Sequence, residues 1–140
     1  MDQPLQIFLI DDDLDDREIF SWVMKSIHPS SEIDSASDGL EALDKLKDHR
    51  YNPHIIFLDL NMPRMHGLDC LRQIRQMERL RLNPVIVYST SSNPHDISQS
   101  RSAGANEYMV KGNEISIIKE ELMQVIEKYN PRSSDHEYGK

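Results

Sequence analysis

The stretch His54-Ile55-Ile56-Phe57-Leu58-Asp59 decides the fold of this 140-residue chain. Pro53 precedes it, and its apolar run stops abruptly at the carboxylate of Asp59. A short apolar run rich in β-branched and aromatic residues is typical of a strand that is buried on both faces. The stretch therefore predicts a central strand that places Asp59 at the edge of a sheet.

Strands and helices are expected to alternate on both sides of this stretch. Further strand patterns occupy residues 5–10, 32–36, 85–88 and 107–110, and helical patterns occupy residues 19–27, 40–46, 68–77, 93–103 and 115–129. Leu40, Leu43 and Leu46 form the expected apolar stripe of the second helix. Five strands, each followed by a helix, predict an α/β fold: a doubly wound parallel sheet with helices on both faces.

The expected fourth helix, residues 93–103, is the most polar of the five. Asn93-Pro94 is a good start signal, Gly104 is a good stop signal, and Ile97 is the main apolar anchor. Few apolar residues bury little surface, so this helix is expected to be marginally stable.

Length and charge limit the class of protein. The chain suits one domain, residues 1–130, followed by a flexible tail at 131–140. Its 16 basic and 24 acidic side chains give a net charge of −8, which argues against direct nucleic-acid binding. No secretory signal or membrane-spanning apolar run is visible, so a cytoplasmic protein without membrane attachment is expected.

Polar side chains follow four of the predicted strands. Asp11 and Asp12 end the first strand, Asp59 the third, Ser89 the fourth and Lys111 the fifth. Because the carboxyl ends of parallel strands share one edge of a sheet, these groups should meet in one crevice. Three close carboxylates favour a hard divalent cation such as Mg²⁺, and the lysine and hydroxyl suit phosphoryl oxygens. The set predicts a phosphoryl-transfer site at which one aspartate acts as nucleophile.

Each of these residues alone would be ordinary at a strand end or on a surface, and only their convergence carries the prediction. Asp13, Asp15 and Asp16 are interpreted mainly as acids at the positive end of a helix dipole.

The motifs resemble those of the response-regulator receiver domain over about residues 5–129. The resemblance rests on Asp11-Asp12, Phe57-Leu58-Asp59-Leu60-Asn61-Met62-Pro63, Ser89, Tyr108 three residues before Lys111, and Ala36-Ser37-Asp38-Gly39-Leu40-Glu41-Ala42-Leu43. It implies a flavodoxin-like sheet in the order 2-1-3-4-5. Single-domain receivers similar to the phytochrome response regulators are the nearest type.

The resemblance also implies roles for the crevice. Asp59 would accept a phosphoryl group from a phosphohistidine on a sensor histidine kinase or phosphotransfer protein. Asp12, Asp59 and the main-chain carbonyl of Asn61 would bind Mg²⁺, or alternatively Mn²⁺, with Asp11 acting through water. Lys111 and Ser89 would each bind a phosphoryl oxygen.

Output is implied to pass through a surface change. Ser89 and Tyr108 would act as the switch, and Asn61 and Ser91 would tune dephosphorylation. The altered face would comprise the fourth helix, fifth strand and last helix, and it would bind a downstream protein or a second copy of the chain. Such a signalling module catalyses only its own phosphorylation and slow autodephosphorylation.

One position departs from the family pattern. Gly112 follows Lys111 where the family usually has proline after a cis bond. A cis bond before a non-proline residue is costly, so a trans bond is expected, with Gly112 at positive φ.

Two other functions compete with the signalling module. A receiver-like module that binds a partner without phosphorylation would explain the departure at Gly112. A phosphatase of the haloacid-dehalogenase type would use Asp11 and Asp13 after the first strand, but the chain lacks the cap insertions of that class.

Overall fold

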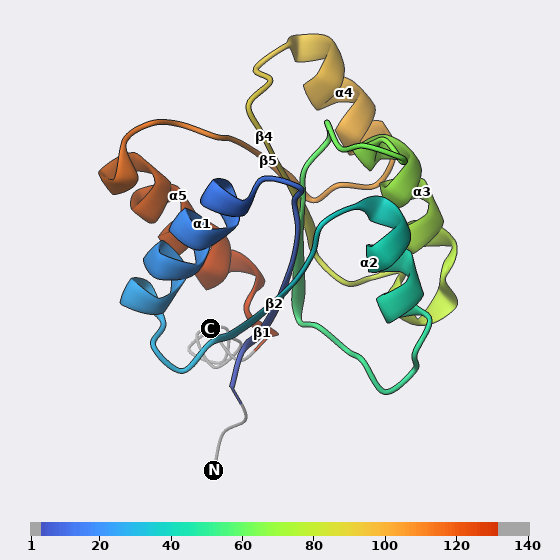
Figure 1. The fold of residues 1–140 in the computed structure, drawn as a ribbon, viewed down its shortest axis with the longest axis horizontal. Coiled ribbons are helices and arrows are strands. Elements are labelled where there is room, and N and C mark those ends of the chain that lie inside the picture. The colour runs from blue at the N-terminus through green and yellow to red at the C-terminus, as the bar shows by residue number, and fades with distance from the viewer. Residues whose placement is uncertain (1–3, 132–140) are drawn as a thin grey trace, which may run out of the picture.

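A five-stranded parallel sheet lies at the centre of the computed structural model, which describes residues 4–131 (Figure 1). The strands are β1 (Gln6–Ile10), β2 (Glu32–Ala36), β3 (Ile55–Leu58), β4 (Val85–Ser89) and β5 (Glu107–Val110). They are ordered β2-β1-β3-β4-β5, and every neighbouring pair is parallel. The predicted doubly wound sheet in the order 2-1-3-4-5 is confirmed.

Helices cover both faces of the sheet. They are α1 (Leu14–Ile27), α2 (Gly39–Leu46), α3 (Gly67–Gln76), α4 (Pro94–Ser102) and α5 (Ile115–Tyr129), with a short 3-10 helix η1 (Glu78–Leu80) after α3. Figure 1 shows α1 and α5 on one side, and α2, α3 and α4 on the other. Within residues 4–131, no helix is both long and apolar enough to cross a membrane.

The alternation of side chains along the central strands builds two separate cores. In β1, Phe8 and Ile10 pack with α2 and α3, whereas Ile7 and Leu9 pack with α1 and α5. β3 divides its side chains in the same way. This explains why Ile55–Leu58 is apolar at every position, since both faces of β3 are buried.

The signals predicted for the two ends of α4 agree with the structure, and α2 begins at a similar polar cap. Asp38 accepts a hydrogen bond from the amide of Glu41 at the start of α2, and Asn93 accepts one from His95 at the start of α4. Gly104 follows the last turn of α4 at φ +114°, where a side chain would be strained.

Three expectations about single residues are corrected. Leu40 is 44% exposed, because Gly39, Ala42, Leu43 and Leu46 form the buried face of α2. Ile97 is only half-buried, and the buried residue of α4 is Ser100.

Gly112 does not have positive φ, although the 111–112 bond is trans as expected. The turn simply has no need of a left-handed residue there, and a Cβ at Gly112 would meet nothing within 4 Å. The predicted tail lies outside the described residues from position 132 onward.

Candidate functional site

Backbone hydrogen bonds bring the predicted site residues together at the carboxyl edge of the sheet. The amide of Asp59 donates to the carbonyl of Ile10 at 2.9 Å, and that of Lys111 donates to Ser89 at 2.7 Å. Parallel pairing therefore continues one residue beyond the strands. As a result, residues from four distant parts of the sequence line one crevice.

The three acidic residues predicted to bind a metal do converge. Asp11, Asp12 and Asp59 offer carboxylate oxygens that all lie within 4.8 Å of one another. Asp11 and Asp59 are buried, whereas Asp12 is exposed at the rim. Clustered carboxylate oxygens of this kind fit a hard divalent cation, which prefers oxygen ligands and offsets their mutual repulsion.

Lys111 is the buried cation at the centre of the crevice. Its Nζ lies 2.7 Å from Asp11 Oδ2, 2.8 Å from Asp16 Oδ2 and 3.5 Å from Asp59 Oδ2. Burial alone would lower the pKa of Lys111, but its carboxylate neighbours outweigh burial and hold that pKa above its usual range. The lysine is therefore a fixed positive charge in this crevice.

Asp59 is the carboxylate with the most perturbed acidity in the crevice. The pKa of Asp59 is raised to about 6, because burial, aided by the charge of Asp11, outweighs the opposing charge of Lys111. Burial also raises the pKa of Asp11. The site thus holds more negative charge than its single lysine neutralises.

Asp16 is a site residue that the sequence interpretation assigned mainly to the helix dipole. Asp13 does cap α1, since its side chain accepts the amide of Asp16 at 3.0 Å. Asp16, however, lies within the first turn of α1 and reaches Lys111. Its position in the first turn of a helix that starts just after Asp11 and Asp12 was the signal that could have revealed it.

Ser89 and Tyr108 are joined through the loop between β4 and α4. The buried Ser89 Oγ accepts the amide of Ser91 at 3.3 Å, and the Tyr108 hydroxyl donates to the carbonyl of Ser91 at 2.8 Å. The Ser91 hydroxyl itself donates to Asp96 on α4 at 2.6 Å. A displacement of Ser89 would therefore alter the hydrogen bonds that connect Ser91 to β5 and α4.

The loop between β3 and α3 carries Asn61 and packs tightly on α3. Asn61 is exposed at the mouth of the crevice. The amide of Gly67 donates to the carbonyl of Leu60 at 2.7 Å, and a Cβ at Gly67 would come within 2.2 Å of the Asp59 carbonyl oxygen. Only glycine permits this close approach behind the site.

Comparison with known proteins places this arrangement in a family. The sequence model of the response regulator receiver domain matches residues 7–127. The chemotaxis protein CheY of Pseudomonas aeruginosa is 31% identical over 126 residues, which cover 90% of this chain and 99% of that protein.

Two solved structures of response regulators are also similar. The phosphorylated cyanobacterial phytochrome response regulator RcpA has a TM-score of 0.83 at 28% identity, covering 92% of this chain and 96% of its own. The Mn²⁺-bound form of response regulator Rcp1 has a TM-score of 0.77 at 30% identity, covering 90% and 94%.

Proposed function

This chain belongs to the response regulator receiver domain family, the phosphoacceptor modules of two-component signalling, and we propose that Asp59 is its phosphoacceptor. A receiver is a signalling module rather than a classical enzyme. The proposed chemistry is limited to phosphorylation of its own Asp59 and slow loss of that group.

The state of the two buried carboxylates supports Asp59 over Asp11. Asp11 is engaged twice: Oδ1 accepts the amide of Asp13 at 3.0 Å and Oδ2 pairs with Lys111 at 2.7 Å. Asp59 has Lys111 at the longer distance of 3.5 Å, so its carboxylate is less neutralised. This difference carries the proposal, because a nucleophile needs an oxygen that is not already held by a cation.

In the proposed reaction, a carboxylate oxygen of Asp59 attacks the phosphorus of a phosphohistidine on a histidine kinase or phosphotransfer protein. The new O–P bond forms as the P–N bond breaks, and its electron pair returns to the imidazole of the donor. Lys111 lies close enough to neutralise the phosphoryl oxygens, and the Ser89 hydroxyl can donate to one of them.

A divalent cation fits the acidic cluster. Asp12, Asp59 and the main-chain carbonyl of Asn61 would hold Mg²⁺ or Mn²⁺, with Asp11 acting through water. Bound there, the ion would offset the charge of the carboxylates and of the incoming phosphoryl group.

The output would follow the link from Ser89 through Ser91 to Tyr108. Movement of Ser89 toward the phosphoryl group would shift the hydrogen bond that Tyr108 makes to Ser91 and so reshape the α4–β5–α5 face. That face would bind a downstream protein or a second copy of the chain. Asn61 and Ser91, which border the crevice, would set the lifetime of the phosphorylated state.

Phosphorylation of the purified protein by a small acyl phosphate tests this function. With Mg²⁺ present, intact mass spectrometry should show one added phosphoryl group on the wild-type protein and none on Asp59→Asn. No adduct with either the acyl phosphate or a beryllofluoride mimic would instead indicate a phosphorylation-independent binding module. Many turnovers of free phosphate with Asp59→Asn unimpaired would indicate a hydrolase that uses Asp11.

A further inference from the structure

Arg64 ties the loop that follows the proposed phosphoacceptor to the start of α2. Its guanidinium pairs with Asp38 Oδ2 through both Nη2 and Nε, with Nε at 3.2 Å. Asp38 is only 7% exposed, and its other oxygen accepts the amide of Glu41 as the cap of α2. The loop is therefore anchored on a carboxylate that is itself fixed in place.

The backbone conformation of Arg64 is unusual. At φ +69°, Arg64 is the one non-glycine residue with positive φ among residues 4–131. This left-handed region favours glycine, because a Cβ crowds the backbone there. An arginine held in it against this preference suggests that its side-chain contacts matter at this position.

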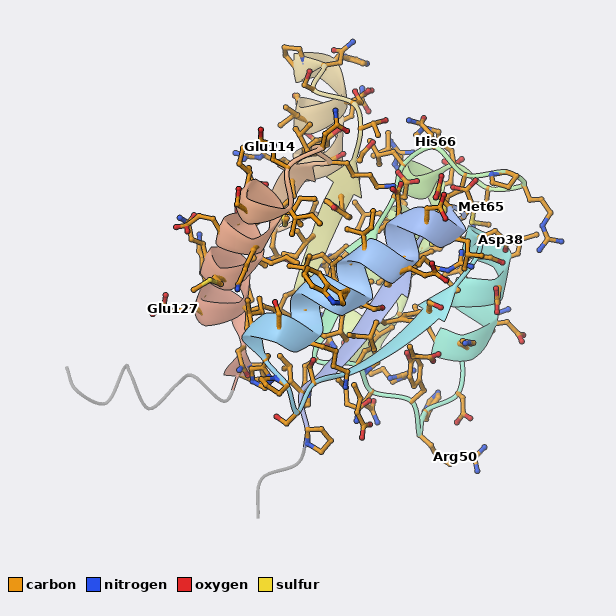
Figure 2. The ribbon with its side chains drawn as sticks, turned by 60° about the vertical axis from the view of Figure 1, so that its left-hand side comes forward. Asp38, Arg50, Met65, His66, Glu114 and Glu127 are labelled. Carbon is orange, nitrogen blue, oxygen red and sulfur yellow. The ribbon has the colours of Figure 1, made fainter. Side chains whose placement is uncertain are left out.

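A second contact lies beside the ion pair. A Cβ on Gly39 would fall 3.0 Å from Met65 Sδ, so the Met65 side chain lies directly against the first residue of α2. Figure 2 shows Met65 and Asp38 close together at this end of the helix. The loop thus touches α2 through two successive residues.

The last residue of β2, just before the turn that holds Asp38, contacts the other acidic loop. The carbonyl of Ala36 accepts the amide of Asp11 at 3.0 Å, two residues before Asp38. The short segment 36–38 therefore bonds both to the loop of Asp11 and Asp12 and, through Arg64, to the loop of Asp59 and Asn61. These are the two loops that would supply the ligands of the divalent cation.

We propose that Arg64 is a positioning residue that, through Asp38, sets the distance between these two loops and so preorganises the cation site. This inference rests on the proposed function, because it concerns the affinity of the same acidic crevice. Arg64 touches neither the cation nor the phosphoryl group in this role. It keeps the Asn61 carbonyl and Asp59 in register with Asp11 and Asp12.

The sign of the effect separates positioning from simple electrostatics. Removing a positive charge near an acidic site makes that site more negative, which alone would tighten Mg²⁺ binding. Loss of positioning would weaken it, and loss of outer contacts at metal sites typically costs about 10-fold or more in affinity. The two explanations therefore predict opposite changes.

Isothermal titration calorimetry with Mg²⁺ provides the test. Arg64→Gly removes the clamp but suits the positive φ, so the loop backbone is not strained further. Arg50→Gly is the matched control, since Arg50 makes a similar two-atom pair with Asp48 beyond the other end of α2. We expect a Kd for Mg²⁺ about 10-fold weaker in Arg64→Gly and unchanged in Arg50→Gly.

Two further variants make the test specific. Arg64→Lys retains the charge without the planar fork and should recover only part of the affinity. Asp38→Asn keeps an oxygen to cap α2 but loses the ion pair, and adding Arg64→Gly to it should cause no further loss. Circular dichroism of the metal-free proteins checks folding, and Asp38→Asn carries the test if Arg64→Gly does not fold.

The outcomes are distinguishable. Equal or tighter Mg²⁺ binding by Arg64→Gly, or an equal loss in Arg50→Gly, would overturn the positioning role alone. A wild-type protein that neither binds Mg²⁺ nor accepts a phosphoryl group would overturn the proposed function, and the positioning role with it.

Discussion

Replacing Asp59 by asparagine should stabilise the metal-free protein, although it removes the proposed phosphoacceptor. The asparagine side chain would have nearly the same shape as the native one but no charge to bury beside Asp11. Asp59 is 6% exposed in the wild-type protein, and burial is the main reason that its pKa rises from the ordinary 3.8 to about 6. Its ionised form is therefore disfavoured in the folded protein.

The size of the effect follows from this shift. Each pKa unit corresponds to about 1.36 kcal/mol. A rise of the Asp59 pKa from 3.8 to about 6 on folding therefore corresponds to roughly 3 kcal/mol in the free energy of unfolding. Because the folded pKa is raised, the favourable contribution of protonated Asp59 is complete below pH 3.8 and is lost as the pH rises through about 6. The advantage of Asp59→Asn should therefore grow from below about 1 kcal/mol near pH 4 to roughly 3 kcal/mol at pH 8.

Urea unfolding of both proteins in EDTA, at pH 4 and at pH 8, measures this difference. Carboxylates outside the crevice titrate alike in the two proteins, so they cancel in the comparison. Asp44→Asn, on the exposed side of α2, is the control for the substitution itself. A gain of the same size at both pH values, or a less stable Asp59→Asn at pH 8, would refute the idea that burial of a charged Asp59 is costly.

Three more predictions concern the cation, the loop and α4. Mg²⁺ at a hundred times its Kd should stabilise the wild-type protein by about 2.7 kcal/mol in thermal or urea unfolding. Asp12→Ala should abolish most of this gain. If Mg²⁺ leaves the stability of the wild-type protein unchanged, the cation site is ruled out. Gly67→Ala should destabilise the protein by about 1–3 kcal/mol or more in urea unfolding, because its Cβ would meet the Asp59 carbonyl oxygen at 2.2 Å. If Gly67→Ala is as stable as the wild-type protein, the loop can move to accommodate the Cβ and the reasoning is wrong. Hydrogen exchange should find α4 less protected than α5, since Ser100 is the buried residue of α4 and its hydroxyl has no hydrogen-bond partner among the described residues. Ser100→Ala should then stabilise the protein by about 1 kcal/mol, and equal protection of the two helices would count against this explanation.

Much of the crevice could be predicted from the sequence because it depends on regular structure. Apolar runs located the strands, and the parallel rule then placed Asp11, Asp59, Ser89 and Lys111 at one edge. Those steps use only local pattern and a general rule of topology. The sheet order itself came from resemblance to a family.

The contacts that were missed depend on where individual side chains point. Asp16 was expected to act mainly on the helix dipole, yet its reach to Lys111 depends on how a helix and a distant strand end meet. The pair between Arg64 and Asp38 joins two loops 26 residues apart. The exposure of Leu40 depends on which residues of a short helix face the sheet. No periodicity in the sequence encodes such contacts.

Chemical mapping of the phosphorylated residue tests the central claim most directly. After reaction with an acyl phosphate and Mg²⁺, borohydride reduction converts an aspartyl phosphate to homoserine, which peptide mass spectrometry locates in the sequence. We predict conversion at Asp59, with Asp11 and Asp12 intact. Conversion at Asp11 or Asp12 would contradict the assignment of the phosphoacceptor.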